Sequence, residues 1–164
     1  MRWFRFAALI LFVTVVQASV LANLDTGPDL LLILMVFFCI YCDPKDAIIS
    51  SFAIGFAADL ISSPMPLMPM GSHTLSFGLF GTGLVYVHRV LNVRNVPSQA
   101  LAIFTVGILA GAAVLSLSLL KGHAITANTW GGLLGIAVYS GIVGPFLFMP
   151  SAWWMCIRTN RFAR

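Results

Sequence analysis

The sequence has 164 residues, of which 60% are hydrophobic and 9% are charged. Soluble domains carry roughly 25% charged residues, so this composition excludes a freely soluble enzyme and a disordered chain, and 3 cysteines are too few for a disulfide scaffold. The formal net charge of +4 comes from basic residues that do not cluster on one stripe, which indicates membrane topology rather than nucleic-acid binding.

Six apolar stretches follow one another along the chain, separated by charges or by proline and glycine. They cover residues 3–22, 29–42, 47–61, 73–88, 98–120 and 130–149. The first, fifth and sixth reach the roughly 20 residues that cross a bilayer core. The turn Asp43-Pro44-Lys45-Asp46 needs water, so we expect the three shorter stretches to span as well, with local thinning or with their ends in the interface. The prediction is one all-α domain over residues 1–164, a polytopic membrane bundle of six transmembrane helices.

The basic residues predict the side of the membrane on which each loop lies. If the N-terminus is cytoplasmic, Lys121 lies outside and every other basic residue lies inside. The inside set is Arg2, Arg5, Lys45, Arg89, Arg94, Arg158, Arg161 and Arg164. We therefore expect a multi-pass protein with both termini in the cytoplasm. A secretory leader cleaved after Ala22 is the alternative for the first stretch, but a multi-span chain needs no removable leader.

Asp59 is the most informative residue, because an ionised side chain inside an apolar segment needs a partner. Ser51, Gly55 and Asp59 recur every four residues, which places the carboxylate on a small-residue stripe that another helix can approach. We expect a structural polar contact between helices, with a hydrogen bond to His73 geometrically allowed. The alternative is a carboxylate that reaches water near the outer end and caps the loop.

Three further patterns resemble ligand or catalytic sites, and their context argues against each. Asp59 with Ser72 and His73 lacks a nucleophile elbow, and the glycines of residues 78–83 lie in an apolar helix rather than after a strand. Cys39 and Cys42 form one CxxC without a second pair, which is weak as a metal site. We predict no enzyme activity, no metal and no cofactor.

Two GxxxG pairs lie on neighbouring predicted helices, Gly107 with Gly111 and Gly131 with Gly135. Small residues at this spacing let helix backbones approach closely. They predict a close crossing between these two helices or with a partner helix.

The order of these features resembles the MreD family of rod-shape-determining membrane proteins. Pro28-Asp29 opens a leucine-rich second helix, residues 55–62 read GFAADLIS, and Pro69-Met70-Gly71 precedes a fourth helix beginning at His73. The match covers nearly the whole chain in helix order, and its motifs are moderately specific. The proline-rich segment 63–71 is longer than the family pattern.

The resemblance implies a six-helix bundle in the bacterial inner membrane, similar to the substrate-binding subunits of energy-coupling-factor vitamin transporters and without catalytic activity. It implies an MreC-like bitopic partner and, through it, MreB, the RodA glycosyltransferase and a class B penicillin-binding protein. Its structural candidates here are Asp59, His73, Gly55, Asp29 and Gly71. The alternative is a substrate-binding subunit of a vitamin-type uptake transporter, which would need several polar groups converging on an outer pocket.

Overall fold

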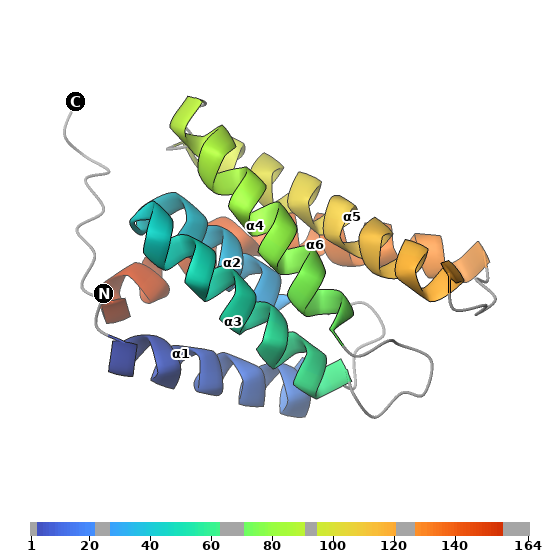
Figure 1. Ribbon diagram of the computed structural model, residues 1–164, viewed down its shortest axis with the longest axis horizontal. Coiled ribbons are helices and arrows are strands. Elements are labelled where there is room, and N and C mark those ends of the chain that lie inside the picture. The colour runs from blue at the N-terminus through green and yellow to red at the C-terminus, as the bar shows by residue number, and fades with distance from the viewer. Residues whose placement is uncertain (1–2, 22–26, 63–70, 91–94, 121–126, 156–164) are drawn as a thin grey trace.

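A computed structural model describes residues 3–21, 27–62, 71–90, 95–120 and 127–155 of the chain. Six α-helices and one short π-helical turn account for almost all of these residues, and no strand occurs among them (Figure 1). The elements are α1 (Trp3–Val16), η1 (Gln17–Leu21), α2 (Leu30–Tyr41), α3 (Pro44–Ser62), α4 (Ser72–Val90), α5 (Val96–Leu120) and α6 (Ala127–Met155). The prediction of an all-α protein with six helices is confirmed.

Helix α2 is the centre of the bundle. Every residue from Leu31 to Ile40 is buried, and α2 contacts each of the other five α-helices. Its sequence, LLLILMVFFCIY, has no polar face, and a helix that is apolar all round is stable only when neighbours surround it. Aromatic rings fill the space beside it, with Phe38 5.0 Å from Phe6 and Phe37 5.5 Å from Phe148 between ring centroids.

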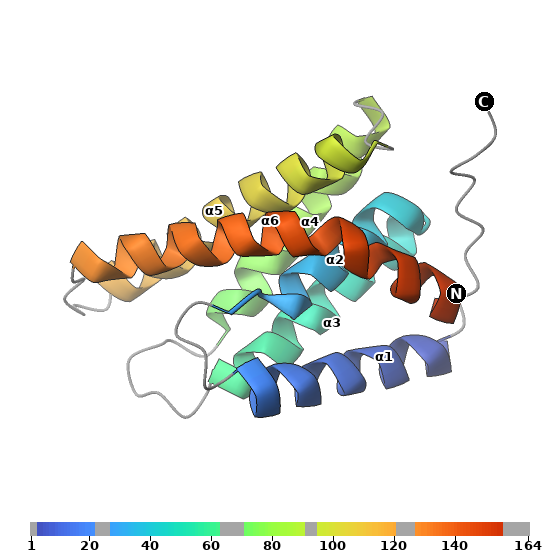
Figure 2. The same ribbon diagram turned by 180° about the vertical axis from the view of Figure 1, so that it is seen from behind.

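Contacts far apart in sequence define one end of the bundle. The indole Nε1 of Trp154, near the end of α6, donates to the carbonyl oxygen of Arg5 in α1 at 3.3 Å. Gln99 in the first turn of α5 donates through Nε2 to the hydroxyl of Tyr41, the last residue of α2, at 2.9 Å. The beginnings of α1 and α5 and the ends of α2 and α6 therefore meet at this end. Seen from behind, α6 crosses the whole molecule over α2 (Figure 2).

Two of the six helices are long and apolar enough to cross a membrane on their own. They are α5, which has 25 residues and includes an 18-residue stretch with a mean hydropathy of 2.3, and Trp130–Met155 of α6, which has 26 residues and includes an 18-residue stretch with a mean hydropathy of 1.8. Helix α2 has 12 residues, which at about 1.5 Å per residue falls well short of a core of about 30 Å. Helix length and apolarity thus support two spans, and not the six that the sequence predicts.

Two predicted boundaries are wrong, and proline is involved in both. The expected turn at residues 43–46 is largely the first turn of α3, because Pro44 opens that helix, where no backbone N–H is required. Helix α6 does not stop at Met149 but continues through Pro145 and Pro150 to Met155. Apolar helices tolerate an internal proline when neighbouring groups satisfy the freed carbonyls, so proline did not mark a helix end here.

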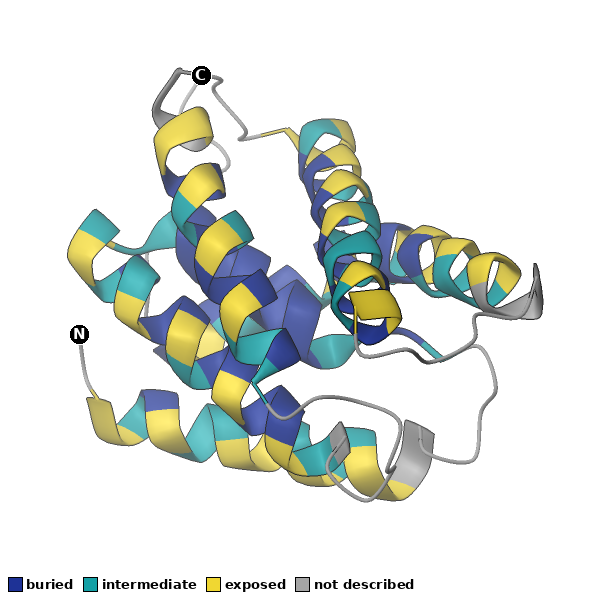
Figure 3. Cartoon of the chain, turned by 45° about the vertical axis from the view of Figure 1, so that its right-hand side comes forward, coloured by how far each residue is buried: buried dark blue, intermediate teal, exposed yellow. Residues whose placement is uncertain are grey.

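Large apolar residues are exposed on several helices, and Figure 3 shows the exposed positions on the outer faces of the bundle. Phe4, Leu79, Leu120, Phe146 and Trp153 are each at least 68% exposed. Buried polar side chains lie inside the same bundle. They are Ser50, Ser51, Asp59, Ser72, Ser76, Gln99, Ser118 and Ser140.

Candidate functional site

Asp59 lies at the contact between α3 and α4, where it caps the beginning of α4. It is 7% exposed. Its Oδ1 accepts the backbone N–H of His73 at 3.0 Å, and its Oδ2 accepts the backbone N–H of Thr74 at 2.9 Å together with the Thr74 hydroxyl. The first amides of a helix have no partner within it and carry partial positive charge. The carboxylate thus satisfies α4 from a neighbouring helix.

Gly71 explains why α4 needs a cap from outside. The carbonyl oxygen of Gly71 accepts the amide of Leu75 at 3.0 Å, which makes Gly71 the residue that opens the helix. An asparagine, aspartate or serine at this position would accept the second and third helical amides with its own side chain. Gly71 has no side chain, and its φ of 92° lies in the region that favours glycine. Asp59 supplies the missing acceptor.

The contact expected between Asp59 and His73 is formed by the backbone of His73 and not by its imidazole. The ring of His73 packs edge-on against Phe77, with centroids 5.8 Å apart. Within the described residues, the donors to the Asp59 carboxylate are the amides of His73 and Thr74 and the hydroxyl of Thr74. The geometry therefore matches a polar contact that joins two helices, and not the alternative of a carboxylate that reaches water, because Asp59 is buried.

The stripe of Ser51, Gly55 and Asp59 lies against α4 along its length. A Cβ at Gly55 would lie 2.7 Å from Cα of Thr74 and 2.8 Å from the carbonyl oxygen of His73. One helical turn further in, a Cβ at Gly81 of α4 would lie 2.7 Å from Cβ of Ser51. Glycine on each helix thus permits close backbone approach, which brings Asp59 within reach of the α4 amides.

A second cap stabilises the beginning of α2, and it uses three elements. Asp29 Oδ1 accepts the amide of Leu32 at 3.1 Å, and Gln17 Oε1 from η1 accepts the amide of Leu31 at 3.1 Å. Gln17 Nε2 also donates to Asp29 Oδ1 at 3.2 Å, and the amide of Asp29 donates to Ser140 Oγ of α6 at 2.9 Å. The sequence pointed to Asp29 but not to Gln17 or Ser140. The one signal for Gln17 in the sequence was its position as a glutamine within a mostly apolar stretch.

The GxxxG residues serve contacts between α5 and α6 within the chain. A Cβ at Gly107 would lie 3.5 Å from Cβ of Ala137, and a Cβ at Gly111 would lie 2.8 Å from Cγ of Leu133. Gly131 has open space where a Cβ would be, and Gly135 is half-buried. Of the two predicted faces, the one on α5 therefore packs against α6.

The two cysteines of the CxxC motif lie at the end of α2. Cys39 is buried in α2, with its Sγ 3.7 Å from Met35 Sδ, 3.4 Å from Ser51 Oγ and 3.5 Å from the carbonyl oxygen of Gly81. No cluster of three or more potential metal ligands occurs within the residues that the structure describes. The third cysteine, Cys156, lies outside those residues, as does the proline-rich segment 63–70.

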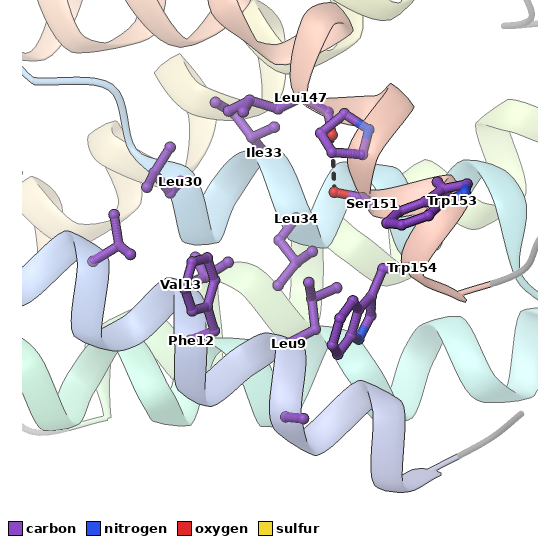
Figure 4. Close-up of a pocket in the computed structure, with 13 residues that line it drawn as sticks. Leu9, Phe12, Val13, Leu30, Ile33, Leu34, Leu147, Ser151, Trp153 and Trp154 are labelled. Carbon is purple, nitrogen blue, oxygen red and sulfur yellow. Dashed lines mark hydrogen bonds between the residues drawn. The ribbon is translucent and has the colours of Figure 1, made fainter.

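An apolar groove opens between α1 and α6, with α2 as its floor (Figure 4). Its volume is about 560 Å³. Figure 4 shows side chains of all three helices pointing into it. The lining includes Leu9, Phe12, Val13, Ile33, Leu34 and Leu147.

We compared the chain with known protein families, curated proteins and solved structures. None of these comparisons finds a match.

Proposed function

We propose that this protein is a non-catalytic integral membrane subunit of the bacterial cell-elongation complex, of the MreD type. Its place would be the inner membrane, with both termini in the cytoplasm. The observation that carries the proposal is the distribution of polarity in the bundle. Buried polar side chains such as Asp59 and Gln99 lie inside, while side chains such as Leu79 and Phe146 are exposed. Lipid around the bundle accounts for this arrangement, because polar groups in a membrane turn toward protein.

We propose that all six helices are embedded in the membrane even though α2 is short. Helices α3 and α4 have 19 residues each, about 28 Å at 1.5 Å per residue. Helix α2 needs no such length, because protein surrounds it on every side. Gln17 and Asp29 accept the amides of Leu31 and Leu32 at its beginning, and Ser140 accepts the amide of Asp29 just before it. Irregular backbone at membrane depth is tolerated where protein buries it.

The orientation receives support from the end of the bundle where Trp154 meets Arg5. This contact brings the beginning of α1 and the end of α6 together, as an even number of spans requires. The flanking sequence at this end carries Arg2, Arg158 and Arg161. Basic residues concentrate on the cytoplasmic side of membrane proteins.

The role of a scaffold is supported by how the polar side chains are used. Asp29 and Asp59 accept the first amides of α2 and α4, which gives them a structural role. The wide apolar faces remain for lateral contact with other membrane proteins. We propose an MreC-like single-span protein as the direct partner, and MreB, RodA and a class B penicillin-binding protein as indirect partners.

Depletion in a rod-shaped host tests this proposal. Cells should widen and become round, the wild-type chain should restore rods, and the tagged chain should copurify with a single-span partner after mild detergent extraction. Gly131→Leu can probe the partner face, since Gly131 has open space, and Gly83→Leu on α4 is a matched control with equally open space. Gly111→Leu is unsuitable because it would collide with Leu133 inside the chain.

Unchanged cell shape after depletion, together with tight binding of a vitamin-sized molecule, would refute the scaffold. It would support the uptake-transporter alternative in its place.

A further inference from the structure

We infer that α1 is a strap that opens sideways from the bundle, pivoting on η1 and held at its beginning by Trp154 of α6. Opening widens the groove between α1 and α6 and gives lateral access to α2, whose residues 31–40 are buried in the closed position that the structure describes. The inference rests on the membrane location in the proposed function, and not on the role in cell elongation.

Helix α1 is attached to the bundle by few buried side chains. Among its 14 residues only Phe6 is buried, and the ring of Phe6 lies edge-on to Phe38 of α2 with centroids 5.0 Å apart. Leu9, Ile10 and Val13 are only partly buried against the core. Segments with few buried apolar contacts have the lowest free energy of local opening, so α1 is the helix that separates most readily.

The opposite wall of the groove is firmly packed. The residues of α6 that line the groove are interleaved with residues that belong to the core. Phe148 is fully buried, with its ring centroid 5.5 Å from that of Phe37 on α2, and Ala152 is buried as well. A change in the width of the groove therefore moves α1 and leaves α6 against α2.

The end of α1 has the features of a pivot. Gln17 accepts the amide of Leu31 at 3.1 Å and donates to Asp29 at 3.2 Å, which fixes this end to the beginning of α2. At Gln17 the chain also changes from α-helical to π-helical geometry. Single π-helical turns are recurrent sites of helix bending. Every α1 residue that lines the groove precedes η1, so this wall of the groove can turn as one piece.

Trp154 holds the beginning of α1 by a long hydrogen bond, which we call the latch. Its Nε1 donates to the carbonyl oxygen of Arg5 at 3.3 Å, whereas about 2.9 Å is typical for such a bond. Trp154 is 48% exposed, so its indole can find another acceptor. Arg5 is about 18 Å from Gln17 along the helix at 1.5 Å per residue. The latch and the pivot therefore lie at opposite ends of the groove.

Apolar surroundings reduce the free energy needed to open α1. In a bilayer, lipid can replace a neighbouring helix without loss of apolar contact, so packing and hydrogen bonds alone hold helices together. The floor that opening uncovers consists of Leu30, Ile33 and Leu34, which are hydrocarbon side chains that lipid accommodates. The open and closed positions therefore differ mainly in the latch and in the ring contact of Phe6.

Spin-label distances in nanodiscs test the pivot, because the two ends of α1 should move unequally. In a variant without native cysteines, Phe4→Cys or Val15→Cys is paired with Phe146→Cys on α6, and all three positions are more than half exposed. A tilt of about 15° about η1 displaces position 4 by about 5 Å and position 15 by less than about 1 Å. We expect a second, longer distance from position 4 in a minor fraction of molecules, and a single distance from position 15.

Two adjacent tryptophans provide a matched pair for the latch. Trp154→Phe removes the donor to Arg5 and keeps an aromatic ring, so it should raise the fraction of molecules with the longer distance about threefold. Trp153→Phe should leave that fraction unchanged, because Trp153 is 81% exposed and makes no hydrogen bond to the residues that the structure describes. An equal rise in both variants would overturn the latch.

Leu79→Cys on α4, paired with Phe146→Cys, is the control for the body of the bundle, and it should give one distance in every variant. A single distance from position 4 in both the parent and Trp154→Phe would overturn the strap, as would equal displacements of positions 4 and 15. A second distance in the control pair would also overturn it, because the whole bundle would then be loose. Failure to insert into nanodiscs would refute the membrane location and the strap together. Unchanged cell shape after depletion would refute the elongation role alone.

Discussion

Asp59 on α3 accepts both the backbone amide and the side-chain hydroxyl of Thr74, fifteen residues further along the chain on α4. This contact occurs where α4 opens with a glycine that has no capping side chain. A carboxylate is acceptor-only when ionised and can serve several donors at once. Asp59, which the sequence singles out as an ionisable residue in an apolar segment, therefore joins two helices.

Asp59→Leu should lower the free energy of unfolding by about 2–3 kcal/mol, because it leaves buried amides of α4 without an acceptor. Asp59→Asn should lower it by about 1 kcal/mol, since the amide keeps one accepting oxygen but turns an NH₂ toward the donors of Thr74. Thermal melting in detergent measures both. Asp43→Asn, at an exposed carboxylate, is the control. If Asp59→Leu melts like the parent, Asp59 is not a cap.

Gly55→Ala should destabilise the protein strongly, by about 2 kcal/mol or more, because the new methyl group meets backbone atoms of His73 and Thr74 that cannot move aside. Gly83→Ala should be neutral or stabilising by up to about 1 kcal/mol, since it adds helix propensity in open space. Both variants add a single methyl group to a helix, so comparative melting isolates the effect of the close approach. Equal stabilities would show that α3 and α4 are further apart than described.

Ser140→Ala should reduce stability by about 1 kcal/mol, because the amide of Asp29 loses its acceptor. Gln17→Leu should have a larger effect, since Gln17 both accepts from Leu31 and donates to Asp29. The double variant should show less than the sum of the two losses, because both residues act on one cap. Ser116→Ala, at an exposed serine bonded within its own helix, is the control. Strictly additive losses of stability would show that Ser140 and Gln17 act independently, and not on one cap.

Single cysteines introduced into a variant without native cysteines should report the topology. Positions 25 and 121 should react with a membrane-impermeant maleimide in intact cells, whereas positions 45 and 94 should react only after the membrane is opened. The physical reason is the concentration of basic residues on one side. A C-terminal cysteine that is labelled from outside would contradict an even number of spans.

The sequence by itself determined that the protein is helical, roughly where each helix lies, and that Asp59 shares a face with Gly55 and Ser51. These follow from local rules, since apolar runs form helices between charged or glycine-containing breaks and a spacing of four residues defines one side of a helix. It did not predict that α6 continues past Met149 and through Pro150 to Met155, because the tolerance of proline depends on neighbouring helices.

Only the tertiary structure decided which helix meets which face. Many exposed side chains of this bundle are as apolar as those of its core, so hydrophobic contrast around a helix says little about its buried side. Residue spacing therefore could not predict that α2 is central or which groups Asp59 contacts. It also could not predict that Gln17 and Ser140 both bond to Asp29 at the beginning of α2. The groove between α1 and α6 likewise exists only because two helices distant in sequence diverge over α2.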